Sequence, residues 1–77
     1  MPGSVYKIIE VVGTSEKSWE DAVKNTIEKA SKTVRNIRIA EVMLLDAKID
    51  KQKIILYRAR VRISFKLEEG EGPEFED

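Results

Sequence analysis

The stretch from Ile54 to Leu67 constrains the fold of this chain most, because its side chains alternate with a period of two. Odd-numbered positions from Ile55 to Leu67 are apolar, whereas the even-numbered positions from Arg58 to Lys66 are basic or polar. Successive side chains of a β-strand point to opposite faces, so this pattern predicts a strand with one apolar and one basic face. At about 3.3 Å per residue the strand reaches roughly 45 Å, longer than a small domain needs. We expect it to be the central strand, paired along both edges.

The segment from Trp19 to Ile37 follows a different period, close to 3.6 residues. Its apolar side chains share one helical face and its charged side chains share the other. Ser18 precedes the segment, and Asp21 follows three residues later, an arrangement similar to a capping box. The pattern predicts one amphipathic helix of about four to five turns, packed on the apolar face of the central strand.

Two further segments have the composition of strands. Residues 5–12 are rich in β-branched side chains and end at Gly13-Thr14-Ser15, which predicts a first strand that enters a turn. Residues 37–49 predict a long second strand that is apolar on both faces. Residues 50–53 are polar and predict a hairpin loop of about four residues between the second and third strands.

The order of these segments predicts an α+β fold of type β-α-β-β. The rules for connections between strands give a three-stranded antiparallel sheet in the order 1-3-2, packed on the one amphipathic helix. We expect residues 1–67 to form a single domain. A chain of this length buries a small core, and the second strand would leave one apolar face in water, carried by Ile39, Met43 and Leu45. The sequence therefore predicts a homo-oligomer.

The charges of the chain are unevenly distributed. The net charge is zero, but all fourteen Lys and Arg residues precede Glu68, and six of the fourteen acidic residues lie in residues 68–77. We expect these ten residues to form an acidic, disordered tail, and the alternative is that they shield a basic surface of the domain.

The absence of cysteine and histidine excludes thiolate nucleophiles, imidazole catalysis and soft-metal sites. We therefore expect no enzymatic activity. No apolar run has the length of a signal or membrane segment, so we expect a cytoplasmic protein with no membrane partner.

The basic face of the central strand has three interpretations. Its side chains form ion pairs with Glu10 and Glu41 in the same or a neighbouring copy, or they capture a phosphate or carboxylate, or they bind nucleic acid. The last is disfavoured, because aromatic side chains are missing from that face and the acidic tail would compete. The basic residues are Arg58, Arg60, Arg62 and Lys66.

Four motifs resemble the dodecins, small β-α-β-β proteins that assemble into hollow homododecamers. The motifs are VYKIIEVVGTS (5–15), SW (18–19), RNIRIAEV (35–42) and SFKLE (64–68). In the best-known branch of that family a flavin ring stacks on a tryptophan of the second strand and pairs with a glutamine of the third. Ile39 occupies the tryptophan position and Arg58 the glutamine position. The resemblance therefore makes flavin (riboflavin or FMN) a doubtful ligand.

The chain is more similar to a second branch, the calcium dodecins. SW at the helix start, IRIAEV, Asp46 and the pair Tyr57-Arg58 carry this likeness. Asp46 stands where the flavin branch often has an arginine, and Lys66 keeps the basic character of a position associated with phosphate. The resemblance implies ligand-binding positions at Ile39, Arg58 and Lys66, and a metal position at Asp46.

The expected function is accordingly a homododecameric protein that binds or stores a small ligand or divalent cation, as calcium dodecins do. Two alternatives remain open. One is a flavin-binding dodecin that stores or buffers riboflavin or FMN, and the other is a structural shell with no dedicated ligand.

Overall fold

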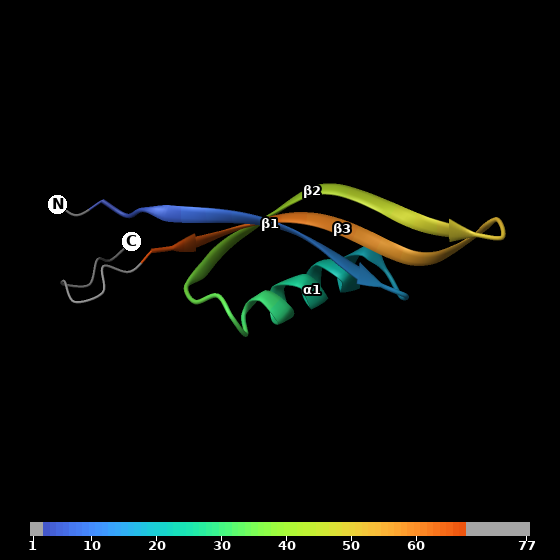
Figure 1. Ribbon diagram of the computed structural model, residues 1–77, viewed down its shortest axis with the longest axis horizontal. Coiled ribbons are helices and arrows are strands. Elements are labelled where there is room, and N and C mark those ends of the chain that lie inside the picture. Colours follow the sequence, from blue (N-terminus) through green and yellow to red (C-terminus); the bar gives the residue numbers. More distant parts are fainter. Residues whose placement is uncertain (1–2, 68–77) are drawn as a thin grey trace.

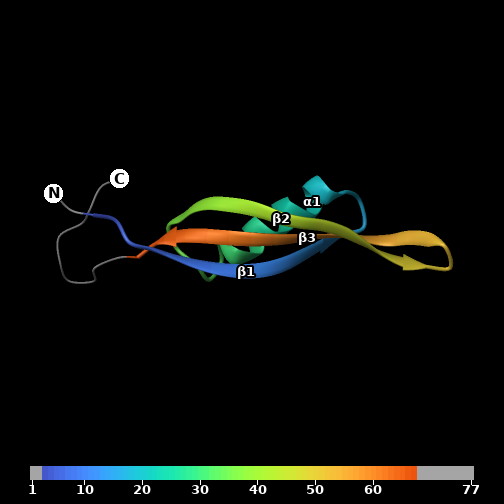
Figure 2. The same ribbon diagram turned by 90° about the horizontal axis from the view of Figure 1, so that it is seen from above.

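The computed structural model describes residues 3–67 and contains four elements in the predicted order. The three strands form one antiparallel sheet in the order β1-β3-β2, and the helix lies against one face of it (Figure 1, Figure 2). This confirms the predicted β-α-β-β fold. The tail predicted for residues 68–77 lies outside the described residues. The elements are β1 (Tyr6–Ser15), α1 (Trp19–Ala30), β2 (Ile37–Asp50) and β3 (Lys53–Lys66).

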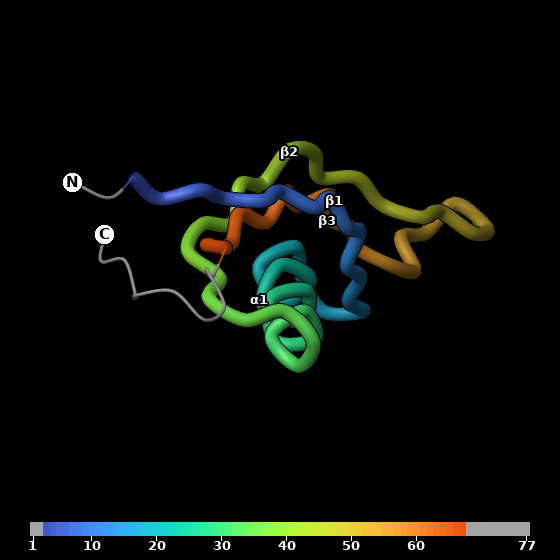
Figure 3. The backbone as a smooth tube through the Cα atoms, turned by 60° about the vertical axis from the view of Figure 1, so that its left-hand side comes forward, coloured from blue at the N-terminus to red at the C-terminus, as the bar shows by residue number. Residues whose placement is uncertain are grey.

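The core lies between α1 and the face of the sheet that we call the inner face. Ala59, Val61 and Ile63 of β3 are fully buried there, together with Ala22 of α1. Viewed nearly along its axis, the helix lies beneath the sheet (Figure 3). The intervening basic side chains of β3 therefore lie on the opposite, outer face, as the alternation predicts.

Strand β1 continues through Gly13 to Ser15, whereas the sequence predicted a turn there. Gly13 pairs with Ala59, and a Cβ at Gly13 would overlap Thr26 Oγ1 and lie 2.8 Å from the carbonyl oxygen of Ala22. The glycine therefore allows close approach of α1 to β1, and the turn follows after Ser15.

Helix α1 begins where predicted but is shorter. Ser18 is the N-cap, and its hydroxyl accepts a hydrogen bond from the Asp21 N–H at 3.0 Å. The helix has 12 residues and ends at Ala30 instead of reaching Ile37. Asn36, the residue before β2, has a φ of 66°, in the left-handed region. Ile37 is thus the first residue of a strand.

A β-bulge in the middle of β2 changes which residues of this strand lie on the inner face and which on the outer face. Val42 pairs with Val61 and Leu44 pairs with Arg60, so Met43 is an extra residue between two adjacent positions of β3. Ile39, which pairs with Ser64, and Leu44 therefore both lie on the outer face. The prediction that Ile39, Met43 and Leu45 share one face was wrong, because it assumed an uninterrupted strand.

The β2–β3 hairpin closes in a shorter turn than predicted. Asp50 pairs with Lys53, and the two residues between them, Lys51 and Gln52, have φ values of 51° and 67°. Positive φ at both positions is typical of a two-residue hairpin turn whose twist matches that of the strands. The hairpin projects beyond α1 and lengthens the molecule (Figure 1).

Candidate ligand-binding face

The outer face consists of rows of side chains that run across the three strands. Each row contains one residue of β3, flanked by its partners in β1 and β2. From row to row along the strands, the residues that flank β3 change between aliphatic and polar or acidic. The rows, in the order β1, β3, β2, are Ile8-Ser64-Ile39, Glu10-Arg62-Glu41, Val12-Arg60-Leu44 and Thr14-Arg58-Asp46.

Asp46 and Arg58 form the tightest ion pair among the described residues. Arg58 Nε donates to Asp46 Oδ1 at 2.7 Å, and Arg58 Nη2 donates to Oδ2 at 3.0 Å. The hydrogen bond from Arg58 lowers the pKa of the Asp46 carboxyl below its ordinary value, and the same bond raises the pKa of Arg58. The residue predicted to bind a metal is therefore already paired with a guanidinium.

Trp19 holds the backbone of Asp46 from the other side of the sheet. Its Nε1–H donates to the Asp46 carbonyl oxygen at 2.9 Å, and its ring contacts Tyr57 edge-on with centroids 4.9 Å apart. The first residue of α1 thus contacts both β2 and β3. The sequence analysis made Trp19 the start of the amphipathic helix but did not predict this bond, although a partly buried indole N–H usually has an acceptor.

Arg60 and Arg62 share one carboxylate. Arg60 Nε lies 3.7 Å from Glu10 Oε2, and Arg62 Nη2 lies 3.7 Å from Glu10 Oε1. Glu41 stands opposite Arg62 in the strand register. One chain thus forms the ion pairs that were expected with Glu10.

The four predicted site residues form two separate groups. Asp46 and Arg58 lie together, whereas Ile39 pairs with Ser64, two residues along β3 from Lys66. Ser64 and Arg58 are six positions apart on β3, which corresponds to about 20 Å. A single chain therefore brings Ile39 near Lys66 but does not bring Ile39 beside Arg58.

Residues 3–67 contain no group of three acidic side chains that could hold a metal ion. Glu41, Asp46 and Asp50 are spread along β2, opposite Arg62, Arg58 and Lys53 respectively. A calcium ion bound at Asp46 would need oxygen ligands from backbone carbonyls, water or another copy.

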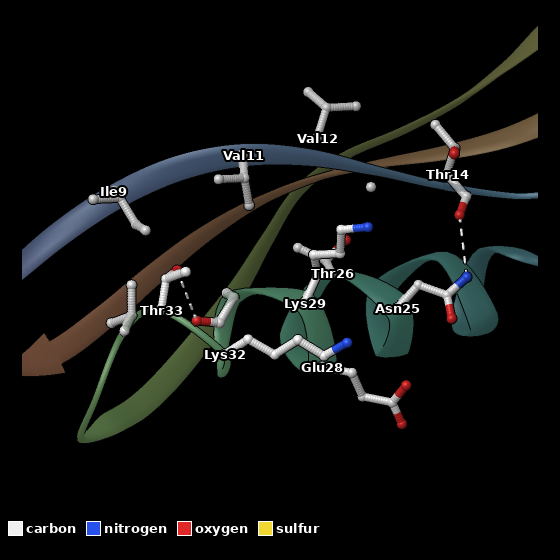
Figure 4. Close-up of a pocket in the computed structure, with 13 residues that line it drawn as sticks. Ile9, Val11, Val12, Thr14, Asn25, Thr26, Glu28, Lys29, Lys32 and Thr33 are labelled. Atoms are coloured by element: carbon white, nitrogen blue, oxygen red, sulfur yellow. Dashed lines mark hydrogen bonds between the residues drawn. The ribbon is translucent and has the colours of Figure 1, made fainter.

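A groove of about 730 Å³ lies between β1 and the C-terminal half of α1. Ile9 and Val11 point into it from β1, and Asn25 Nδ2 crosses it at one end to donate to the Thr14 carbonyl oxygen at 3.2 Å (Figure 4). None of the predicted site residues lines this groove.

No helix among the described residues is long and apolar enough to cross a membrane.

These features define a small β-α-β-β protein whose sheet covers one helix and leaves a charged and apolar face exposed. The Dodecin family model matches residues 5–68. Calcium dodecin of Mycobacterium tuberculosis is 41% identical over 64 residues, which cover 83% of this chain and 90% of the relative. Dodecin of Thermus thermophilus is 36% identical over 67 residues, which cover 87% and 97%.

Solved structures agree with these relatives. Dodecin from Streptomyces coelicolor has a TM-score of 0.85 at 32% identity, covering 90% of this chain and 99% of that one. The M. tuberculosis calcium dodecin, described as a calcium-chelating antigen with a novel calcium-binding site, has a TM-score of 0.76 at 37% identity, with coverage of 91% and 100%. The chain belongs to the dodecin family, which confirms the resemblance found in its motifs.

Proposed function

We propose that this chain forms a cytoplasmic homododecamer that binds or stores a small ligand or a divalent cation and catalyses no reaction. The outer face carries the proposal, because one chain alone leaves its aliphatic side chains in water. Ile39 is 60% exposed and Leu44 is 55% exposed, on the β2 side of this face. Covering such side chains with further copies stabilises a chain that has a small core.

The proposed ligand site lies at a junction between copies. Ile39 and Lys66 lie at one end of the outer face, and Arg58 and Asp46 lie at the other. In a symmetric contact between two copies, the same surface patch is used twice. Such a contact would bring the first pair of one copy close to the second pair of its neighbour.

Calcium is the ligand that we favour. The M. tuberculosis relative, 41% identical, is described as calcium dodecin. Asp46 supplies a carboxylate, the type of oxygen ligand that calcium prefers. Each Asp46 oxygen accepts one hydrogen bond from Arg58 and keeps capacity for a further contact. Calcium would therefore compete with the guanidinium of Arg58 for the Asp46 carboxylate, or share that carboxylate with it.

A flavin is the alternative ligand, and the side chains present fit it less well. Ile39 has no planar surface for stacking. Arg58 donates but cannot accept hydrogen bonds, and its Nε and Nη2 already donate to Asp46. Lys66 would still provide a cation for a phosphate group such as that of FMN.

Three measurements on the purified protein test the proposal. Light scattering should show a particle of twelve chains, elemental analysis should find bound calcium, and the absorbance spectrum should lack flavin bands. A well-folded monomer at micromolar concentration would overturn the assembly. A yellow preparation would establish the flavin alternative, and an intact particle with neither metal nor chromophore would indicate a shell without a dedicated ligand.

Calcium titration of variants tests the metal position separately. Asp46→Asn should weaken calcium binding, because an amide carries no charge, while Asp50→Asn near the hairpin turn serves as the control. Unchanged affinity in Asp46→Asn would remove Asp46 from the site.

A further inference from the structure

The charges of this chain are divided between the domain and the residues that follow it. Residues 1–67 contain all fourteen basic and eight of the fourteen acidic residues, so their net charge is +6. Residues 68–77 contain the other six acidic residues and no basic residue. Two oppositely charged parts joined in one chain attract each other at a high effective concentration.

The outer face provides cationic groups that are incompletely paired. Arg60 and Arg62 share the Glu10 carboxylate at 3.7 Å each, longer than the roughly 2.7–2.9 Å of a charge-assisted hydrogen bond. Arg58, by contrast, has a bidentate partner in Asp46. Arg60 and Arg62 are therefore the arginines of this face that can accept another carboxylate.

Aliphatic side chains of β1 border these arginines. Val12 pairs with Arg60 and is 48% exposed, and Ile8 lies further along the same side of the face and is 54% exposed. Residues 74–77 read Glu-Phe-Glu-Asp, which places one aromatic ring among three carboxylates. Such a ring can pack on aliphatic side chains and on a guanidinium while the carboxylates pair with arginine.

The length of the acidic segment is sufficient to reach these groups. Strand β3 ends at Lys66, and the Leu67 N–H still donates to the Val5 carbonyl oxygen at 2.8 Å. Arg62 and Arg60 lie about 13 and 20 Å back along β3 from Lys66. Ten residues span at most about 34 Å, and Gly70, Gly72 and Pro73 are residue types that favour a reversal of the chain.

We propose that residues 68–77 fold back over the β1 side of the outer face, where their carboxylates bind Arg60 and Arg62 and Phe75 packs on Ile8 and Val12. The contact shields the basic stripe from other anions and from nucleic acid. It leaves Ile39 and Leu44, on the β2 side, available for contacts between copies. The inference does not depend on which ligand the protein binds.

A spin label on the acidic segment tests the contact in the full chain. The chain has no cysteine, so Gly72→Cys creates a single site for a nitroxide. In methyl-labelled protein, the nitroxide should reduce the signals of Ile8 and Val12 more than those of Ile9 and Val11, their neighbours on the inner side of β1. About 1 M salt, where the Debye length is about 3 Å, should abolish the effect.

Charge variants of the labelled chain identify the groups involved. Replacing Arg60 and Arg62 by Gln, or Glu74, Glu76 and Asp77 by their amides, should restore the signals of Ile8 and Val12. Arg58→Gln is the matched control and should leave the pattern unchanged, because that arginine is paired with Asp46. Light scattering on each variant separates loss of this contact from loss of assembly.

Three outcomes would overturn the proposal. Uniform signal loss, or the strongest loss at Ile9 and Ile27, would place the segment elsewhere. A pattern that survives in the Arg60→Gln and Arg62→Gln double variant would show that these cations are not its partners. Signal loss that occurs only when label and methyl groups are on different chains would assign the contact to a neighbouring copy.

Discussion

Asp46 of β2 and Arg58 of β3 face each other in the strand register and are joined by two hydrogen bonds, of 2.7 and 3.0 Å. Because Arg58 lowers the pKa of Asp46 below the ordinary value of 3.8, the pair stabilises the folded state when the carboxylate is ionised. This stabilisation is present above the unfolded pKa and is lost as the pH falls through the lower, folded value.

Asp46→Asn should therefore lower the melting temperature near pH 7, and its difference from wild type should shrink below about pH 4. The effect is small, because both side chains are about half exposed. Thermal unfolding followed by circular dichroism at both pH values measures it. Arg58→Gln should show the same pH dependence, and a difference that does not change with pH would contradict this account.

Gly13→Ala should destabilise the fold by about 1–3 kcal/mol, because the added methyl group would overlap Thr26 and crowd the Ala22 carbonyl. Urea unfolding measures the change. Gly3→Ala is a matched control, since nothing lies within 4 Å of its new Cβ. The double variant Gly13→Ala with Thr26→Ala should recover only part of the loss, because the backbone oxygen remains. If Gly13→Ala were as stable as Gly3→Ala, α1 would be able to move away from β1 at no cost in free energy.

Trp19→Phe should cost about 0.5–1.5 kcal/mol, because it removes the hydrogen bond to the Asp46 carbonyl but keeps an aromatic ring near Tyr57. The bond is exposed, so water can replace it and the lower end of this range is expected. Denaturant unfolding followed by far-UV circular dichroism measures the change. A loss well above this range would mean that the smaller ring leaves a cavity.

Leu44→Asp should dissociate the particle and lower its melting temperature, because it places a charge on the β2 side of the outer face. Ile49→Asp, near the hairpin turn, is the control, since Ile49 and Leu44 are 57% and 55% exposed. Light scattering at micromolar concentration separates the two results. If Ile49→Asp dissociates the particle equally, the interface is not confined to the outer face.

Wild-type protein should bind riboflavin weakly. An aromatic ring beneath the flavin contributes about 1–3 kcal/mol, and polar groups left unpaired at its edge cost a similar amount. Together these losses amount to roughly two to four powers of ten in affinity. Quenching of riboflavin fluorescence should increase more for Ile39→Trp with Arg58→Gln than for either change alone. Because one chain holds these positions about 20 Å apart, purely additive gains would show that they do not share a site.

Two features of the fold that depend on neighbouring residues in the sequence were predicted correctly, and one that depends on more distant parts of the chain was not. The alternation in β3 and the cap formed by Ser18 are local properties of the chain, and both were predicted correctly. The end of α1 was predicted wrongly, because the apolar period continues through Val34 to Ile37 after the backbone has left the helix. The left-handed conformation of Asn36, directly before β2, also leaves no mark on hydrophobic periodicity.

The amino-acid sequence by itself determined the family, the order of the elements, the two faces of β3 and the division of charge between domain and acidic segment. The family follows from the resemblance of four sequence motifs, and the other three follow from side-chain period, local propensity and composition. The tertiary structure decided that Met43 forms a bulge, that Leu44 joins Ile39 on the outer face, and that Asp46 pairs with Arg58. The physical reason is that strand register arises between two strands: one extra residue in β2 reverses the face of every residue up to the next bulge, and no periodicity within β2 alone reveals where it lies.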